Sequence, residues 1–175
     1  MITLGFISVR FHANHGFFGG YLLLNELARP LEFHCTLPVQ PTRAQQILYG
    51  PTLNEFVCGE QIGRALAFKA KCLPDLILVD SLSVLTLRHM HSGPLGFLET
   101  APNRNSTLEH PESHRSEHFG FRLQEENWKT LPEYASDADE FRKLFAVKKF
   151  EMDLVEPFGR IEEALLEAHP TAKSA

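Results

Sequence analysis

The sequence has few cysteines and no long hydrophobic run, and both absences narrow the class of protein. The three cysteines, Cys35, Cys58 and Cys72, are odd in number and include no CxxC pair, which excludes a disulfide-rich scaffold and a cysteine-based zinc site. A membrane-spanning helix needs about 18 apolar residues, and no apolar segment of the chain approaches this length. The N-terminus has no basic segment followed by an apolar run, as a signal peptide would have. We therefore expect a cytoplasmic protein without a signal peptide or a membrane partner.

Positive charge is also scarce. The chain carries 22 acidic and 17 basic side chains, which gives a net charge of −5. A chain with this balance produces no overall field that attracts phosphates. The densest basic cluster lies between residues 142 and 149 and has acidic residues around it, as is typical of a solvated helix face. We therefore do not expect nucleic acid as a partner.

The common fingerprints of catalysis and cofactor binding are missing as well. No serine stands in a GxSxG motif, and no glycine-rich loop has the spacing of a phosphate-binding or dinucleotide-binding loop. The glycines of GFFGGY (16–21) lie inside an expected strand, where Gly19 and Gly20 indicate a β-bulge rather than a close approach of another backbone. We predict no cofactor, and a divalent metal is left open.

Hydrophobic periodicity predicts strands and helices in a mixed order. Apolar runs separated by short turns predict an antiparallel meander, and capping boxes at Thr42 and Thr52 predict two successive helices. A continuous apolar run then predicts a buried strand, followed by a helix and a further strand. The expected strands are 3–11, 17–24, 31–37, 74–80 and 93–99, and the expected helices are 43–49, 53–71, 81–91, 132–147 and 154–168.

Together these elements predict a single α/β domain over residues 1–175. Its mixed five-stranded sheet, within residues 1–99, combines the antiparallel meander 1-2-3 with two parallel strands in the order 3-2-1-4-5. Polar, weakly periodic residues predict an irregular excursion over 100–127, and C-terminal helices follow over 128–169.

A histidine beside a cysteine in LEFHCTL (31–37) raises the question of a reactive pair. Side chains alternate along a strand, so Cys35 should face the core and His34 the polar side. Residues on opposite faces do not act together as nucleophile and base. His34 remains a candidate for function, whereas Cys35 is expected to pack as a small hydrophobic residue.

The order of elements over residues 1–99 and the strand PDLILVD (74–80) resemble ribonuclease-H-like folds of the endonuclease V type. The resemblance implies divalent metal ions held by acidic residues on the first strand and at the end of the fourth. Asp80 stands at the fourth-strand position, where helix N-capping is the alternative role. The first strand, TLGFISVRF (3–11), has no acid and offers Ser8 and Arg10 as its polar candidates in place of one, which argues against nuclease activity.

Nine histidines are the most unusual feature of the composition. His114 and His118 have the i,i+4 spacing of half a zinc site, and the alternative is a solvated, histidine-rich loop. Arg115 stands where a zinc protease carries its catalytic glutamate, which excludes that class. His89 and His91 stand at an expected helix C-terminus, where the helix dipole favours a protonated histidine. The turn HANHG (12–16) is expected to expose its two histidines, His12 and His15, to solvent.

Two functions are consistent with these observations. The leading interpretation is a non-catalytic, soluble binding or assembly module, homo-oligomeric or bound to a protein partner. The alternative is a metal-dependent hydrolase whose ligands come from His34, Glu60, Asp80 and the segment 110–118. The hydrolase requires these side chains to converge around one point, and the binding module requires a contiguous apolar surface with scattered histidines.

Overall fold

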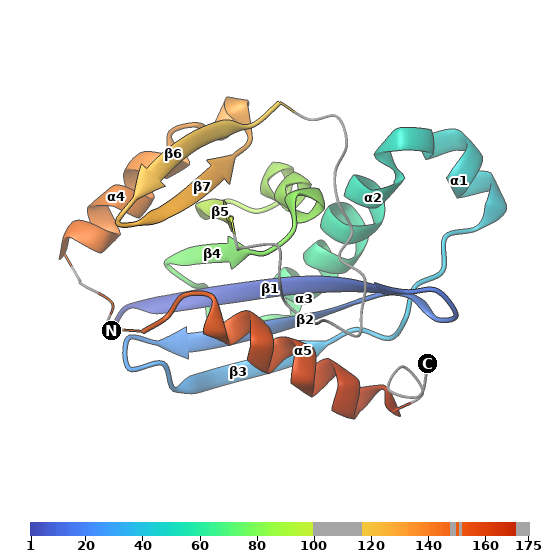
Figure 1. Ribbon diagram of the computed structural model, residues 1–175, viewed down its shortest axis with the longest axis horizontal. Helices are drawn as coiled ribbons and strands as arrows, with labels where there is room; N and C mark the ends of the chain where they lie inside the picture. Colours follow the sequence, from blue (N-terminus) through green and yellow to red (C-terminus); the bar gives the residue numbers. More distant parts are fainter. Residues whose placement is uncertain (100–116, 148–149, 151, 171–175) are drawn as a thin grey trace.

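The computed structural model describes residues 1–99, 117–147, 150 and 152–170 (Figure 1). Its strands are β1 (Thr3–His12), β2 (Gly16–Asn25), β3 (Pro30–Cys35), β4 (Leu76–Val79), β5 (Leu95–Leu98), β6 (Phe119–Leu123) and β7 (Glu126–Thr130). Its α-helices are α1 (Arg43–Tyr49), α2 (Leu53–Glu55), α3 (Arg64–Lys69), α4 (Asp137–Val147) and α5 (Glu156–Ala168). Other helical segments are the 3-10 helices η1 (Gly50–Thr52), η3 (Leu82–His89) and η4 (Pro132–Tyr134) and the π-helix η2 (Phe56–Gly63).

The strands form one mixed sheet, which confirms the α/β class. Their order is β3-β2-β1-β4-β5-β7-β6. Strands β1, β2 and β3 form the antiparallel meander, and β4 and β5 lie parallel to β1. The prediction of five strands is wrong in number, and the full order differs because two further strands extend the sheet beyond β5.

The additional strands are the hairpin β6–β7, within the stretch expected to be irregular. Strand β7 pairs antiparallel with β5, and Phe121 pairs with Trp128 across the hairpin. The turn places Gln124 at a φ of 56°, a conformation that asparagine or glycine usually supplies in a tight hairpin. Because Gln124 and Glu125 form this turn, the turn residues give no recognisable hairpin signal.

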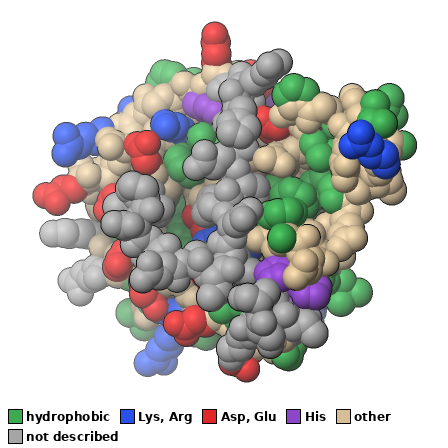
Figure 2. Space-filling view, turned by 45° about the vertical axis from the view of Figure 1, so that its right-hand side comes forward, with side chains coloured by type: hydrophobic (Ala, Val, Ile, Leu, Met, Phe, Trp, Pro, Cys, Tyr) green, Lys and Arg blue, Asp and Glu red, His purple; other side chains and the backbone are tan. Residues whose placement is uncertain are grey.

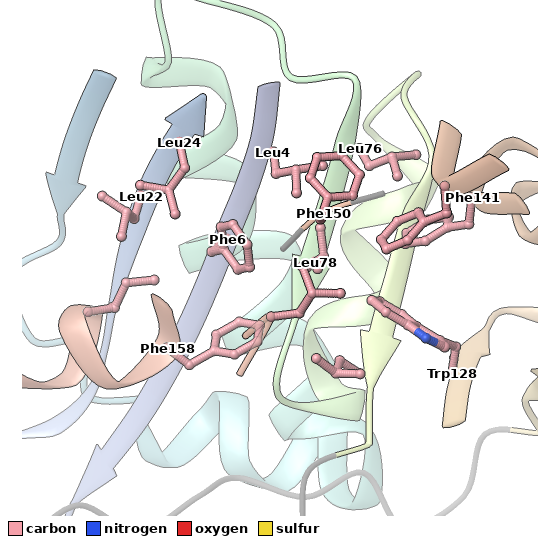
Figure 3. Close-up of a cluster of buried hydrophobic side chains, with 14 of the residues drawn as sticks. Leu4, Phe6, Leu22, Leu24, Leu76, Leu78, Trp128, Phe141, Phe150 and Phe158 are labelled. Carbon is pink, nitrogen blue, oxygen red and sulfur yellow. The ribbon is translucent and has the colours of Figure 1, made fainter. Parts of the chain in front are cut away.

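Two hydrophobic cores cover the two faces of the sheet. Helices α4 and α5 cover one face, where Phe6 of β1 packs edge-on against Phe158 of α5 at 5.4 Å between ring centroids. The close-up in Figure 3 shows this core continuing from Phe158 to Trp128 and Phe141. Segments η2, α3 and η3 cover the opposite face. The sheet is therefore buried on both sides, as its near-continuous apolar strands require.

Helix capping agrees with the sequence prediction at one start only. Thr42 and Gln45 form both hydrogen bonds of the capping box at α1. Thr52 instead donates its hydroxyl to the carbonyl of Tyr49 and caps nothing, so the second box is wrong. The helical stretch that follows runs from residue 53 to 69 and is a π-helix in its middle.

Gly19 and Gly20 permit close packing on both faces of β2. A β-carbon on Gly19 would lie 2.6 Å from Ile62 of η2, and one on Gly20 would lie 2.6 Å from Ile161 of α5. The β1–β2 register runs through both glycines without interruption. The expected bulge is therefore wrong, and the close approach of two helices is what these glycines serve.

Among the residues that the structure describes, no helix is both long and apolar enough to span a bilayer.

Candidate functional site

A polar centre lies where β1 and β4 approach their carboxyl ends. The two strands are parallel, and Ile7 pairs with Val79, so that Ser8 and Asp80 come next to each other at the following position. Leu4 and Phe6 of β1 belong to the core beneath α5, and strand alternation continues that face with Ser8 and Arg10. In Figure 1 these strand ends point towards the β1–β2 hairpin.

The centre consists of Ser8, Arg10, Asp80 and Glu162, and is called the Arg10–Asp80 centre below. The Nη2 of Arg10 lies 2.7 Å from Oδ2 of Asp80, and the Ser8 hydroxyl donates to the same oxygen at 2.9 Å. Glu162 of α5 contributes a second carboxylate, with Oε2 3.8 Å from Nη2 of Arg10. The side chains of Arg10 and Asp80 are 5% and 3% exposed, and that of Glu162 is 13% exposed. Glu162 is therefore the member nearest to solvent.

Arg10 carries a permanent charge in this buried setting. Burial by itself would lower the pKa of Arg10, but the charge of Asp80, the hydrogen bond between them and the charge of Glu162 raise that pKa above its usual value. Nη1 also donates to the carbonyl of Val9 at 3.2 Å. The buried Nε has no hydrogen-bond partner among the described residues. Nε is thus the one guanidinium nitrogen of Arg10 without a hydrogen-bond acceptor among the described residues.

Two histidines continue the polar row at the end of β1. His12 follows Arg10 on the same face and is 7% exposed, which corrects the expectation that it faces solvent. The rings of His12 and His15 stack with their centroids 4.7 Å apart. The backbone amide of Asn14 donates to Nδ1 of His12 at 3.2 Å, so Nε2 carries the proton when this ring is neutral. Figure 2, turned to bring this side forward, shows histidine side chains beside apolar ones.

The residues at this centre do not fit the divalent metal ion that the resemblance implies. Oδ2 of Asp80 already accepts from Ser8 and Arg10, and a guanidinium stands between the two carboxylates. A dication that reached Asp80 and Glu162 would lie against this fixed positive charge. No group of three or more histidine, cysteine, aspartate or glutamate side chains within the described part of the chain could hold a metal ion.

Asp80 is not a helix cap. The N-cap position of η3 is Ser81, and no side-chain capping hydrogen bond is present there. Asp80 instead binds residues of β1 that are 70 and 72 positions away in the sequence. The carboxylate therefore joins two strands rather than beginning a helix.

The structure does not bring the other hydrolase candidates to Asp80. His34 lies on edge strand β3, pairs across the strands with Tyr21, and stacks on that ring at 6.1 Å. Tyr21 belongs to the core on the face opposite to Asp80. Glu60 is exposed on η2, which covers that same opposite face. The sheet thus separates both residues from Asp80.

His34 takes part in a local structural network instead. Its Nε2 lies 3.0 Å from Oε2 of Glu32, and Glu32 also accepts the backbone amides of Lys71 and Cys72 at 3.0 and 2.9 Å. These bonds tie the chain after α3 to β3. Cys35, on the other side of β3, packs partly buried against the core beneath α5, as the strand alternation predicted.

The Glu32 network predicts a loss of stability in acid. The amide of Lys71 and the hydrogen bond with His34 lower the pKa of Glu32 to about 2. Because this value lies below the ordinary 4.5, the network stabilises the folded state above pH 4.5, and the contribution is lost as the pH falls towards 2. Urea denaturation at pH 6 and pH 3 should show a smaller loss for Glu32→Gln than for the wild type. Equal losses in both proteins would contradict this account.

Of the two candidate zinc ligands, His114 and His118, the structure describes only His118. His114 lies outside the described residues, so the predicted pair with His118 stays a prediction. His118 is partly buried, and its Nε2 has no partner among the described residues. Burial lowers the pKa of His118, and the charge of Lys129 lowers it further.

Sequence reasoning missed two polar residues of this site, Glu162 and His12. Glu162 lies on α5, a helix whose charged residues otherwise read as a solvated face, and only tertiary packing brings it to Arg10. His12 could have been assigned to the buried face by strand alternation, had the strand been extended to residue 12. Ser8 and Arg10 were recognised as the polar residues of β1, although not as partners of Asp80.

Comparison with known proteins gives a likeness of fold. No model of a known protein family matches the sequence, and no curated protein sequence matches it. Human ENDOV is similar in structure over 100% of this chain and 87% of its own, with a TM-score of 0.51 and 12% identity. An endonuclease V from Ciona intestinalis, bound to DNA with an inosine followed by a ribo-adenosine, matches 60% of this chain with a TM-score of 0.38 and 10% identity. This chain spans about half, 48%, of that second protein.

The likeness to human ENDOV confirms the endonuclease V-like fold that the sequence predicted. It contradicts the interpretation as a non-catalytic binding or assembly module, because the whole chain has the fold of a class named for cutting nucleic acid. It also contradicts the exclusion of nucleic acid as a partner. That exclusion relied on the net charge of the whole chain, whereas a local site determines whether phosphates bind. The hydrolase alternative is the better supported of the two interpretations.

Proposed function

We propose that this protein binds nucleic acid and acts on it as a phosphodiester hydrolase at the Arg10–Asp80 centre. The observation that carries this proposal is the position of the centre. Buried charged groups lie at the carboxyl ends of β1 and β4, the edge of an α/β sheet where ligands commonly bind. The fold around this centre is endonuclease V-like.

The residues of the centre have distinct roles in such a reaction. Arg10 supplies the positive charge of the centre, and a guanidinium fixed in a buried site stabilises the negative charge that develops during phosphoryl transfer. Asp80 and Ser8 hold the guanidinium in place. His12 lies two residues further along β1, at roughly 6.6 Å by strand geometry, and imidazole is the most frequent group for moving a proton.

The cytoplasm is the compartment that we propose for this activity. All three cysteines are free, and Cys72 is exposed, which is the pattern of a reducing environment.

The proposal is tested with labelled oligonucleotides. Single-stranded and double-stranded DNA and RNA are incubated with the protein, binding is measured by fluorescence anisotropy at two salt concentrations, and cleavage is measured on denaturing gels. We expect binding that weakens as salt rises, together with strand cleavage. Absence of both binding and cleavage on every oligonucleotide would overturn the proposal.

Replacing Arg10 separates its role from that of other arginines. Arg10→Met should lower the cleavage rate by about 100-fold or more, the scale of removing one preorganised donor. Arg142→Met is the matched control, because Arg142 lies on α4 in an exposed ion pair with Asp139. Folding of each variant is checked by circular dichroism. If Arg10→Met is unfolded, the cleavage rate of Arg10→Lys, which keeps the positive charge, is measured in its place. Equal rates for wild type and both Arg10 variants would remove Arg10 from the mechanism.

A further inference from the structure

The resemblance to endonuclease V-type folds implies one acidic residue on the first strand and one at the end of the fourth. The β1–β4 register shows which residues occupy these two positions in this protein. Ser8 lies beside Asp80 and donates its hydroxyl to Oδ2, so a serine occupies the first-strand position nearest to the fourth-strand acid. Arg10, the next residue of β1 on the same face, brings a positive charge to that acid. Strand β1 thus lacks the acidic metal ligand that the resemblance implies, and it carries the positive charge of Arg10 instead.

The guanidinium of Arg10 offsets part of the negative charge of the centre without a metal ion. Two carboxylates, Asp80 and Glu162, face one guanidinium at 2.7 and 3.8 Å. A magnesium ion binds oxygens at about 2.1 Å in octahedral geometry. To bind Oδ2 of Asp80 in this arrangement, it would have to displace the hydrogen bonds from both Arg10 and Ser8. At the other oxygen of the same carboxylate, it would lie close to the positive charge of the guanidinium.

Arg10 cannot easily give way to a metal ion. It remains protonated, because guanidinium does not lose its proton in proteins, and its side chain is 5% exposed on a central strand of the sheet. The Nη1 donor to the Val9 carbonyl anchors the group a second time. Rotating the charge out of the centre would leave the buried carboxylate of Asp80 and the partly buried carboxylate of Glu162 without this cation.

We infer that Arg10 is the built-in cation of this centre and takes the place of a divalent metal ion. The protein therefore binds no magnesium or manganese at Asp80. Its action on nucleic acid, which rests on the proposed function, proceeds without either metal. The guanidinium supplies the positive charge towards the phosphodiester that a metal ion would otherwise supply.

Manganese binding tests the inference without nucleic acid. Free Mn²⁺ is measured by electron paramagnetic resonance during titration of the wild type, Asp80→Asn, and Arg142→Ser as a surface control. We expect the wild type to take up no more Mn²⁺ than Asp80→Asn. Stoichiometric uptake by the wild type that is lost in Asp80→Asn would overturn the inference.

A double variant shows whether Arg10 is what excludes the metal. Ser8→Asp with Arg10→Ser removes the guanidinium and places a second carboxylate beside Asp80, and we expect it to gain stoichiometric Mn²⁺ binding. A folded double variant that takes up no Mn²⁺ would overturn the assignment of Arg10 as the substitute cation. If the double variant does not fold, the Mn²⁺ uptake of the wild type compared with that of Asp80→Asn still tests whether a metal ion binds at Asp80.

Cleavage in the presence of chelator distinguishes this inference from the proposed function. Activity that persists in EDTA and is unchanged by added magnesium supports both. Cleavage that EDTA abolishes and magnesium restores would support the proposed function and overturn the inference. Absence of cleavage and binding, with no Mn²⁺ uptake at Asp80, would overturn the proposed function and leave the cation assignment standing.

Discussion

Replacing Asp80 by alanine is expected to lower the free energy of unfolding by about 3–5 kcal/mol, the scale of breaking a buried ion pair. The substitution leaves the guanidinium of Arg10 buried, with the more distant Glu162 as its remaining carboxylate partner among the described residues. It also removes the acceptor of the Ser8 hydroxyl, and a buried donor without an acceptor adds to the loss. Urea denaturation followed by the fluorescence of Trp128, the single tryptophan, measures the change.

Two further variants show whether the loss comes from the unpaired charge. Asp80→Asn keeps an acceptor oxygen and should lose less than Asp80→Ala. The double variant Asp80→Leu, Arg10→Met replaces both charges with apolar side chains and should regain much of the lost stability. A loss below about 1 kcal/mol for Asp80→Ala, the range of solvent-exposed pairs, would contradict the burial of this centre.

Replacing Asp137 by alanine is expected to have an effect of similar size, about 3–5 kcal/mol. Asp137 accepts two hydrogen bonds from Arg88, at 2.7 and 3.1 Å, and one from the backbone amide of Leu95 at 3.1 Å. One carboxylate therefore joins η3, β5 and the start of α4. The guanidinium of Arg88 also lies over the ring of Tyr134 at 4.2 Å, so it cannot turn to solvent without losing a second contact. Thermal and urea unfolding of Asp137→Ala measure the loss.

The matched control for Asp137 lies two residues further along the same helix. Asp139 pairs with Arg142 at 2.8 Å, but both side chains are largely exposed. Asp139→Ala should therefore change the free energy of unfolding by less than about 1 kcal/mol. Equal effects of the two substitutions would show that helix charge, rather than the buried network of Asp137, produces the loss.

The sequence alone does not show that Asp80 and Asp137 contribute more to stability than other acidic residues. Asp137 stands among acidic residues that read as the first turn of a helix, which is a favourable place for negative charge in any case. Asp80 could be read as a helix cap or as the end of a strand. Their importance comes from Arg88 and Arg10, which lie 49 and 70 residues away in the sequence.

The predicted elements succeeded where the local signal was strong and failed where it was weak. The apolar run before Asp80 predicted β4, and alternation around His34 and Cys35 placed these two residues on opposite faces of β3. The hairpin β6–β7 was missed because its turn at Gln124 lacks the usual residues. Its alternation of Phe119, Phe121 and Leu123 was the one signal that could have found it.

The sequence by itself determined the α/β class, the antiparallel meander and the apolar strands that follow it, because periodicity and turn chemistry are local properties. The order of these elements then carried the resemblance to endonuclease V-type folds. It also showed that the first strand carries Ser8 and Arg10 in place of an acid. Only the tertiary structure decided that Arg10, Asp80 and Glu162 meet in one buried centre, and that His34 and Glu60 lie across the sheet from it. The reason is that strand register and helix docking, which bring distant residues within hydrogen-bonding distance, depend on the packing of the whole chain.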